Sequence, residues 1–149
     1  MDNTSFKIRP ATLTDYDNIW SIFKEVIKSG DTYVYDPNTQ KEGMEGHWFA
    51  PKIHTFVAEQ KGQIVGSYYI KPNQTGLGSH VANASYMVHH EYRGQGIGQL
   101  LCEHSKETAK QLGFIAMQFN MVVSTNKPAV HLWQKCGFRI IGTIPKGYL

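Results

Sequence analysis

A glycine-rich turn near the middle of the chain carries the residues best suited to bind an anion. An apolar run that ends at Val88 is joined to a helical pattern by a turn that contains Arg93, Gly94, Gln95, Gly96, Ile97, Gly98 and Gln99. Glycine has no Cβ, so the backbone can approach a ligand closely, and the free N–H groups of a first helical turn attract negative charge. With the guanidinium of Arg93 beside it, this turn predicts a site for phosphate groups.

Two other phosphate-binding loops fit the turn less well. A dinucleotide-binding loop needs the spacing G-x-G-x-x-G and an acidic residue about 20 residues later. The spacing here is G-x-G-x-G, and the segment from Gly113 to Phe119 holds no acid. A Walker loop ends in Gly-Lys-Ser/Thr, whereas Gly98 is followed by Gln99 and Leu100. A glycine turn that only precedes a surface helix remains as the alternative without function.

Two motifs resemble those of one enzyme superfamily. The Arg-x-x-Gly-x-Gly spacing is similar to the acyl-CoA pyrophosphate loop of the GNAT superfamily of acetyl-CoA-dependent N-acyltransferases. Asn126-Lys-Pro-Ala129, followed by Gln134-Lys-Cys-Gly-Phe138, resembles the signature of the family's fourth helix. The resemblance implies an α/β (α+β) GNAT fold, with a mixed, mostly antiparallel central sheet of about six to seven strands flanked by about four helices.

The resemblance also implies how acetyl-CoA, the expected co-substrate, is held. In the family, the strand before the loop separates from the next strand, and its backbone pairs with pantetheine as an added strand would. Met87, Val88 and His89 occupy that segment here, and the resemblance makes the N–H of Val88 the donor to the oxyanion. It also makes Asn126 a contact to CoA, while a plain helix N-cap is the alternative role.

Trp133 departs from the common pattern of the superfamily. Many members carry a tyrosine at this position, four residues after the signature alanine, to protonate the leaving thiolate. An indole N–H is too weak an acid for that step, so water or a different residue must supply the proton. We expect Trp133 to pack under the cofactor as an apolar helix residue.

A narrower resemblance covers the region from Ser29 to the C-terminus. The block Tyr69-Ile-Lys-Pro-Asn73 is its most specific part, and it is similar to the yeast azetidine-2-carboxylate N-acetyltransferases, which act on a proline analogue. Those enzymes also carry tryptophan at the position of Trp133. The resemblance implies that the acceptor is a small cyclic amino or imino acid.

Asn83 and Asn120 are the candidate catalytic and acceptor-binding residues under this interpretation. They would lie on the two separating strands, where an amide side chain can both accept a hydrogen bond from the amine and donate one to a carboxylate or oxyanion. Hydrogen bonds to neighbouring backbone groups are the alternative. Tyr33, Tyr35 and Trp48 could wall the acceptor pocket, although an aromatic core explains them equally well.

Composition agrees with a single domain that spans residues 1–149. The chain is 41% hydrophobic and 18% charged, and its net charge of +3 is too small and too scattered for a nucleic-acid site. It shows neither a signal-peptide pattern nor an apolar run long enough for a membrane span, so we expect a cytoplasmic protein. Cys102 and Cys136 should be free core thiols. His89 and His90 should point to opposite sides of an extended segment, which makes a metal site improbable.

Apolar periodicity and turn residues predict alternating strands and helices. Strands are expected at Phe6–Arg9, Thr55–Gln60, Gln63–Ile70, Val81–Val88, Phe114–Val123 and Arg139–Ile144. Helices are expected from Thr14 or Asp15 to Gly30, from Thr39 to Trp48, from Ile97 to Gly113, and from Asn126 to Lys135.

Three function classes remain open at this point. The first and favoured class is a small-molecule N-acetyltransferase, the second a peptide or protein N-acetyltransferase that acts on an N-terminus or a lysine, and the third a catalytically silent acyl-CoA binding module. The superfamily normally has a seventh strand beside the fifth, yet the sequence stops at Leu149. We therefore expect either that the chain continues or that another chain, as in a homodimer, supplies this strand.

Overall fold

The computed structural model describes residues 5–148, so Leu149 and the first four residues of the predicted domain lie outside the described part. The chain runs in the order β1 (Lys7–Pro10), α1 (Tyr16–Ser29), α2 (Gly46–Phe49), β2 (His54–Gln60), β3 (Gln63–Pro72), β4 (Val81–Val88), α3 (Ile97–Gln111), β5 (Ala116–Met117) and α4 (Lys127–Lys135). Three short 3-10 turns, Leu13–Asp15, Gly76–Gly78 and His90–Tyr92, connect them. The strand and helix predicted on either side of the glycine-rich turn are thus present.

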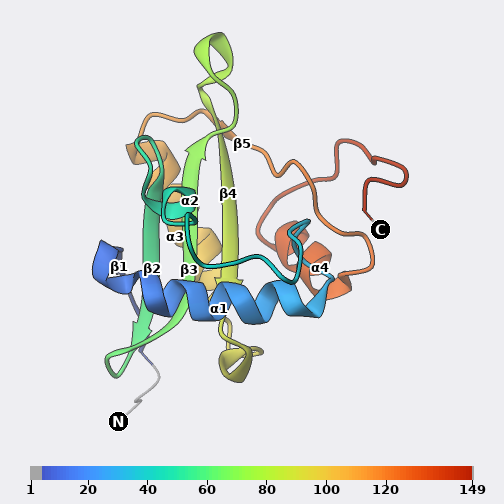
Figure 1. Cartoon of the computed structure of the whole chain (residues 1–149). Helices are drawn as coiled ribbons and strands as arrows, with labels where there is room; N and C mark the ends of the chain where they lie inside the picture. The colour runs from blue at the N-terminus through green and yellow to red at the C-terminus, as the bar shows by residue number, and fades with distance from the viewer. Residues whose placement is uncertain (1–4, 149) are drawn as a thin grey trace.

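The strands form one sheet in which the order in space equals the order in the chain, β1-β2-β3-β4-β5. The first four strands pair antiparallel. β5 runs parallel to β4 and pairs with it only through Val81 with Ala116 and Ala82 with Met117. Figure 1 shows α1 and α2 in front of the sheet and α3 behind it, and we call these sides the front face and the back face.

Each face of the sheet carries its own core, because successive side chains of a strand point to opposite sides. On the front face Met87 of β4 packs in one cluster with Phe23 of α1 and Trp48 of α2. On the back face Ala82 and Ala84 of β4 pack in a second cluster, which includes Ile97 and Leu101 of α3. Odd-numbered side chains of β4 therefore face α1 and α2, and even-numbered ones face α3.

Local signals place the element ends. α1 buries the repeating apolar residues Ile19, Trp20, Ile22, Phe23, Val26 and Ile27, and it ends where Gly30 adopts a φ of 68°. The predicted hairpin is confirmed: β2 and β3 are joined by Lys61 and Gly62, both with positive φ, as a two-residue turn of the favoured hairpin type requires.

The described part holds five strands, so the expectation of about six to seven is wrong for residues 5–148. Of the strand predicted at Phe114–Val123, only Ala116–Met117 forms. The strand predicted at Arg139–Ile144 does not form, and Ile140 and Ile141 in it are 65% and 77% exposed. An apolar pattern sets only a preference, since a strand also needs a neighbour for its backbone N–H and C=O groups.

The helix predicted from Thr39 to Trp48 is wrong over most of its length, because only the four residues of α2 are helical. The preceding segment turns back on itself: the N–H of Thr39 bonds to the carbonyl of Asp36, and Gly43 has a φ of 82°. Both features break the regular backbone hydrogen bonding of an α-helix.

Two further expectations concern the class of protein. Cys102 and Cys136 are free and buried, as predicted, and burial raises the pKa of the Cys102 thiol. Among the helices of residues 5–148, none is long and apolar enough to cross a membrane.

Candidate active site

The glycine-rich turn forms the anion-binding geometry that its sequence predicts. After β4 the chain makes the 3-10 turn His90–Tyr92, passes Gly94 with a φ of 77°, and enters the 15-residue α3 through Gly96 with a φ of 81°. L-residues with a side chain rarely adopt such φ values. Residues 93–96 are exposed, so a ligand can approach the positive end of the α3 helix dipole through the turn.

The three glycines of the turn differ in their roles. A Cβ on Gly94 or Gly96 would meet no atom within 4 Å, so these two residues are needed for their backbone conformation and for the open space above them. A Cβ on Gly98 would lie 3.0 Å from Cδ2 of Leu132. Gly98 therefore allows α3 to pack closely against α4, and its contact with the cofactor stays a prediction.

Arg93 and Asn126 both lie near the loop that follows α1. Hydrogen bonding by Ser29, and to a smaller extent the charge of Arg93, lower the pKa of Asp31, so the guanidinium lies near that loop. The Oδ1 of Asn126 accepts from the N–H of Ala129 at 3.3 Å, which is the N-cap role, and its Nδ2 donates to Thr32 Oγ1 at 3.4 Å. The cap explains the asparagine locally, and its second bond connects α4 to the loop.

The edge of β4 that faces β5 is uncovered beyond Ala82. The carbonyl of Ala82 accepts from the N–H of Gln118, whereas the N–H of His89 bonds to the carbonyl of Val65 on β3. Because backbone groups alternate along a strand, even-numbered residues of β4 turn their N–H and C=O toward β5 and odd-numbered residues toward β3. Past Ala82, the described residues supply no strand for the groups of Ala84, Tyr86 and Val88. We call this stretch the open edge.

Of the three residues predicted to pair with pantetheine, Val88 turns its backbone toward the open edge. Met87 pairs with Ser67 of β3, and the N–H of His89 bonds to Val65 of β3 while its carbonyl accepts from the N–H of Tyr92. The expectation that the adjacent histidines point apart is wrong: the rings of His89 and His90 stack, with centroids 4.6 Å apart. His90 already belongs to a 3-10 turn, where the alternation of a strand no longer holds. The described residues contain no cluster suited to a metal ion.

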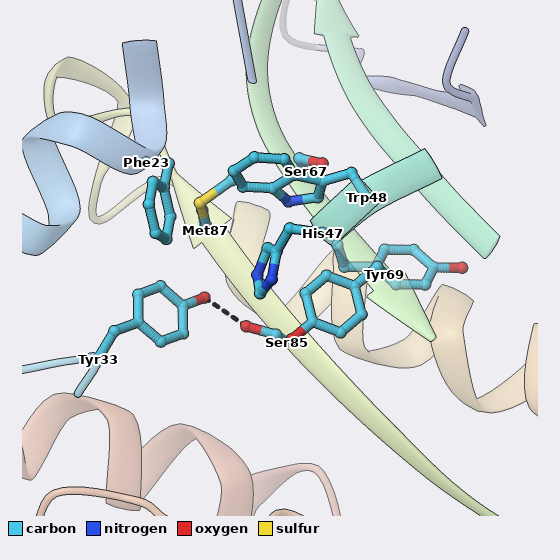
Figure 2. A pocket seen from close by; sticks show the side chains of 9 residues that line it. Phe23, Tyr33, His47, Trp48, Ser67, Tyr69, Ser85 and Met87 are labelled. Atoms are coloured by element: carbon cyan, nitrogen blue, oxygen red, sulfur yellow. Dashed lines mark hydrogen bonds between the residues drawn. The ribbon is translucent and has the colours of Figure 1, made fainter. Parts of the chain in front are cut away.

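A narrow aromatic pocket lies on the front face, beside the open edge (Figure 2). It is lined by Phe23, Tyr33, His47, Trp48, Ser67, Tyr68, Tyr69, Ser85 and Met87. The hydroxyl of Tyr33 accepts from Ser85 Oγ at 2.6 Å and donates to the carbonyl of Tyr86 at 2.7 Å. Tyr33 thus connects the pocket to the open edge, and burial raises the pKa of its hydroxyl.

Tyr35 and Trp48, the other two predicted wall residues, lie in the same aromatic cluster. The ring of Tyr35 is 5.3 Å from that of His47, and its hydroxyl is 3.2 Å from His47 Nδ1. Trp48 is only 2% exposed and packs edge-on against Phe23, so it forms the floor of the pocket and part of the core at once. Trp48 thus lines the pocket and belongs to the core, whereas Tyr35 packs against that core without lining the pocket, and contact of either residue with the acceptor stays a prediction.

His47 lines the pocket, although the sequence did not mark it as a candidate site residue. Burial, together with the nearby charge of Lys71, lowers the pKa of His47 to about 4, so the ring is neutral near pH 7. A histidine with so low a pKa can form hydrogen bonds in the pocket wall, but it cannot act as the base that removes a proton from an ammonium group. Its position next to Trp48 in a four-residue helix carries no periodic signal.

The structure places the two candidate asparagines at different sites. Asn83 lies on the front face of β4, in line with Ser85 and Met87, and its Nδ2 donates to Asn73 Oδ1 at 3.3 Å. Asn120 is exposed in a wide groove between the segment after β5, α4 and residues 139–148, and its Oδ1 accepts from Gln118 Nε2 at 3.3 Å. Each bonds a neighbouring side-chain amide rather than the backbone.

Trp133 packs on the back face of β4, as a helix residue should. Its ring lies 4.8 Å from that of Tyr86 and 5.0 Å from that of Phe119. Burial raises the pKa of Tyr86, whose hydroxyl bonds at 2.6 Å to Ser105 Oγ, which in turn donates to the carbonyl of Cys102. Tyr86 is thus held in the core and is no substitute acid.

Comparisons with known proteins agree with this geometry. A structure of a GCN5-related N-acetyltransferase from Kribbella flavida is 41% identical, with a TM-score of 0.90 over 96% of this chain and 88% of that one. Acetyltransferase yncA from Salmonella typhimurium, solved with its cofactor acetyl-CoA, is 19% identical, with a TM-score of 0.87 over 98% and 86% of the chains, and shows the shared fold.

A curated relative, N-acetyltransferase aca1 of Schizosaccharomyces pombe, is 30% identical over 134 residues. The match covers 79% of this chain, and the chain spans 64% of the length of that relative. Its name specifies no acceptor, so the narrower resemblance to the azetidine-2-carboxylate enzymes stays a prediction. Members of the acetyltransferase (GNAT) family take their acetyl group from acetyl-CoA. The model of this family matches residues 16–138, and the chain belongs to the family.

Proposed function

We propose that the protein transfers the acetyl group of acetyl-CoA directly to the amine of a small amino or imino acid. The observation that carries this proposal is the hydrogen bond from Tyr33 to the carbonyl of Tyr86. It joins the front-face aromatic pocket to the open edge of β4, and that edge leads to the anion-binding turn. The pocket itself encloses only about 10 Å³, so we place the acceptor at its rim. Donor and acceptor can therefore meet at one point of the sheet, which is the main requirement for a direct transfer.

We assign the donor to residues that follow one another along β4, the glycine-rich turn and the start of α4. Arg93 and the first N–H groups of α3 match the pyrophosphate, and Asn126 lies on the adjacent helix terminus. The open edge offers backbone groups that an amide-containing chain can pair with as a strand would. Once bound there, acetyl-CoA supplies an activated acetyl thioester.

The chain's own groups would stabilise the reacting carbonyl. The N–H of Val88 points toward the open edge and is our candidate donor to the developing oxyanion. Nothing needs to reorganise, because the strand already holds that N–H in place. With Trp133 packed against Tyr86 as an apolar residue, we assign protonation of the leaving thiolate to water.

We prefer a small acceptor to a peptide. Aromatic rings from α1, α2 and β3 line the narrow pocket, whereas a peptide or a lysine side chain on a protein would use an open groove, such as the one that contains Asn120. The pKa of about 8 for an α-amino group at a chain terminus does not carry over to a free amino or imino acid, because the ionised carboxylate beside the amine stabilises its ammonium form. His47, with a pKa of about 4, is too weak a base to take up that proton, so we assign its removal to water.

Thiol release from acetyl-CoA tests the proposal. Azetidine-2-carboxylate, proline analogues and ordinary α-amino acids are compared with a lysine peptide and with a reaction that lacks any acceptor. We expect a small amino or imino acid to be the best acceptor. A peptide that outperforms them would establish the protein-acetylating alternative, and acetyl-CoA binding without thiol release for any acceptor would indicate a silent binding module.

Replacing Asn83 or Asn120 with alanine tests the acceptor contacts. Loss of a hydrogen bond to a charged group should lower kcat/KM by about ten- to 150-fold while the affinity for CoA stays unchanged. Asn83 has the stronger support, since it shares the front face with the pocket. Asn18→Ala on the exposed side of α1 is the matched control. Full rates in both variants would remove these asparagines from the site.

A further inference from the structure

Lys71 of β3 stands at the rim of the aromatic pocket. It lies directly opposite Asn83 of β4 in the sheet register, two residues from Tyr69, and so shares the front face with both. Its ammonium is 5.5 Å from the centroid of the Tyr69 ring. Its charge also reaches His47 and contributes to that ring's low pKa, so the ammonium faces the pocket rather than the opposite end of the strand.

No carboxylate of the described chain neutralises this ammonium. The six ion pairs found within residues 5–148 involve Arg9, Lys28, Lys41, Lys106 and Lys110 as the cations. The pocket itself is lined by aromatic, hydroxyl, imidazole and thioether groups, without an acid. The described contact of the ammonium is the cation–π interaction with the Tyr69 ring, which is a weak one at a partly exposed site. The rim therefore has a positive charge that a bound anion would neutralise.

The position of Lys71 matches the point where transfer would occur. Tyr69, which its ammonium covers, lies opposite Ser85 in the register, and Ser85 donates to the Tyr33 hydroxyl that reaches the open edge at Tyr86. Lys71 is two residues, about 7 Å along the strand, from Tyr69, and its side chain brings the ammonium over the Tyr69 ring, at the level of Ser85. The amine of an α-amino acid is only two bonds from the carboxylate carbon, so a carboxylate held there would place the amine beside Ser85 and the open edge.

We infer that Lys71 binds the carboxylate of the acceptor and makes the protein selective for amines that carry a neighbouring anionic group. This inference rests on the proposed function and adds the specificity determinant to it. An acceptor with a second positive charge, such as a polyamine, would instead meet the ammonium of Lys71 as a like charge. The amide of Asn83, directly across the ladder, can donate to the second oxygen of the same carboxylate.

The test compares an amino acid with its own carboxamide, for example proline with prolinamide. In the parent protein the acid should have the higher kcat/KM by at least about tenfold. Lys71→Gln should lower kcat/KM for the acid by about ten- to 100-fold, mainly through KM, and leave the carboxamide within about threefold. Lys71→Glu should reverse the preference. Lys24→Gln, on the exposed side of α1, is the control.

Binding measurements separate this inference from the proposed function. Calorimetric titration of the CoA-loaded protein with acid and carboxamide reports recognition without turnover, and the affinity for CoA alone reports the fold of each variant. Turnover with equal preference for acid and carboxamide, or an equal loss for both in Lys71→Gln, would refute the role of Lys71 and leave the proposed function standing. Acid-selective binding that needs Lys71 but gives no thiol release would refute the proposed function instead. If the loaded protein neither binds nor acetylates either compound, both proposals fail.

Discussion

The hydroxyl of Tyr33 lies 2.7 Å from the backbone carbonyl of Tyr86 and donates a hydrogen bond to it across 53 positions of the chain. Tyr33 belongs to the irregular segment between α1 and α2, and Tyr86 to the part of β4 that β5 leaves uncovered. The bond satisfies a carbonyl that would otherwise lack a strand partner. It also holds the aromatic wall of the pocket against the open edge.

Tyr33→Phe should therefore destabilise the fold. The change removes one phenolic hydroxyl and leaves both the Tyr86 carbonyl and the Ser85 hydroxyl without this partner, which costs about 1 to 3 kcal/mol. Urea unfolding measures the loss. Tyr92→Phe is the control, since its exposed hydroxyl bonds only to Gln63 and should change stability by less than about 0.5 kcal/mol. Equal unfolding midpoints for the two variants would contradict the role assigned to Tyr33.

Gly96→Glu should abolish binding of acetyl-CoA, with a loss of affinity above about 100-fold. A side chain and a negative charge would then lie where the pyrophosphate meets the start of α3. Gly113→Glu offers a matched control at the other end of the same helix, because Gly113 also has a positive φ, 88°, and open space around its Cβ position. Calorimetry with CoA on folded protein compares them. Parallel losses in the two variants would point to backbone strain rather than to a phosphate site.

Trp133→Phe should keep most of the turnover. The indole packs against Tyr86 and Phe119, and a phenyl ring retains much of that contact. We expect kcat to fall by less than about tenfold, because no proton is assigned to this side chain. Single-turnover rates, measured together with the affinity for CoA, test whether Trp133 takes part in the reaction. A thousandfold drop with intact CoA binding would show that Trp133 takes part in the chemistry.

His47 should make stability depend on pH below neutrality. Its pKa of about 4 in the folded chain lies below the ordinary value of 6.5, so the unfolded chain takes up the proton first. The stabilisation from the neutral ring is complete above about pH 6.5 and is lost as pH falls toward 4. Between pH 7 and pH 4.5 the parent should lose about 2 kcal/mol more unfolding free energy than His47→Gln.

Urea unfolding at the two pH values provides this comparison. His54→Gln, at an exposed position of β2, should follow the parent at both. Other groups, among them the carboxylate of Asp15, whose pKa the bonded Arg9 guanidinium lowers, also lose stabilisation in acid. Only the difference between parent and variant reports on His47, and an identical loss in both would show that its ring is not held neutral by the fold.

Features that depend on a few consecutive residues were predictable from the sequence. The turn from Gly94 to Gly98 needs positive φ and a helix start, and glycine spacing specifies both. The β2–β3 hairpin follows from Lys61 and Gly62 between two alternating strands, and α1 from its apolar repeat. The N-cap of α4 was likewise visible as Asn126 before a helical run. Each of these features depends on residues within a single turn, strand or helix.

Tertiary structure decided which segments found partners. Phe114–Val123 and Arg139–Ile144 look alike as apolar strands, yet two residues of the first pair with β4 and none of the second pairs with a strand in the described chain. In the folded chain His47, which lies on a short helix, packs against Tyr69, and Lys71 lies beside both. Sequence specifies what each residue can bond to, but contacts between distant segments form only when packing makes their surfaces coincide, and that depends on the whole chain at once.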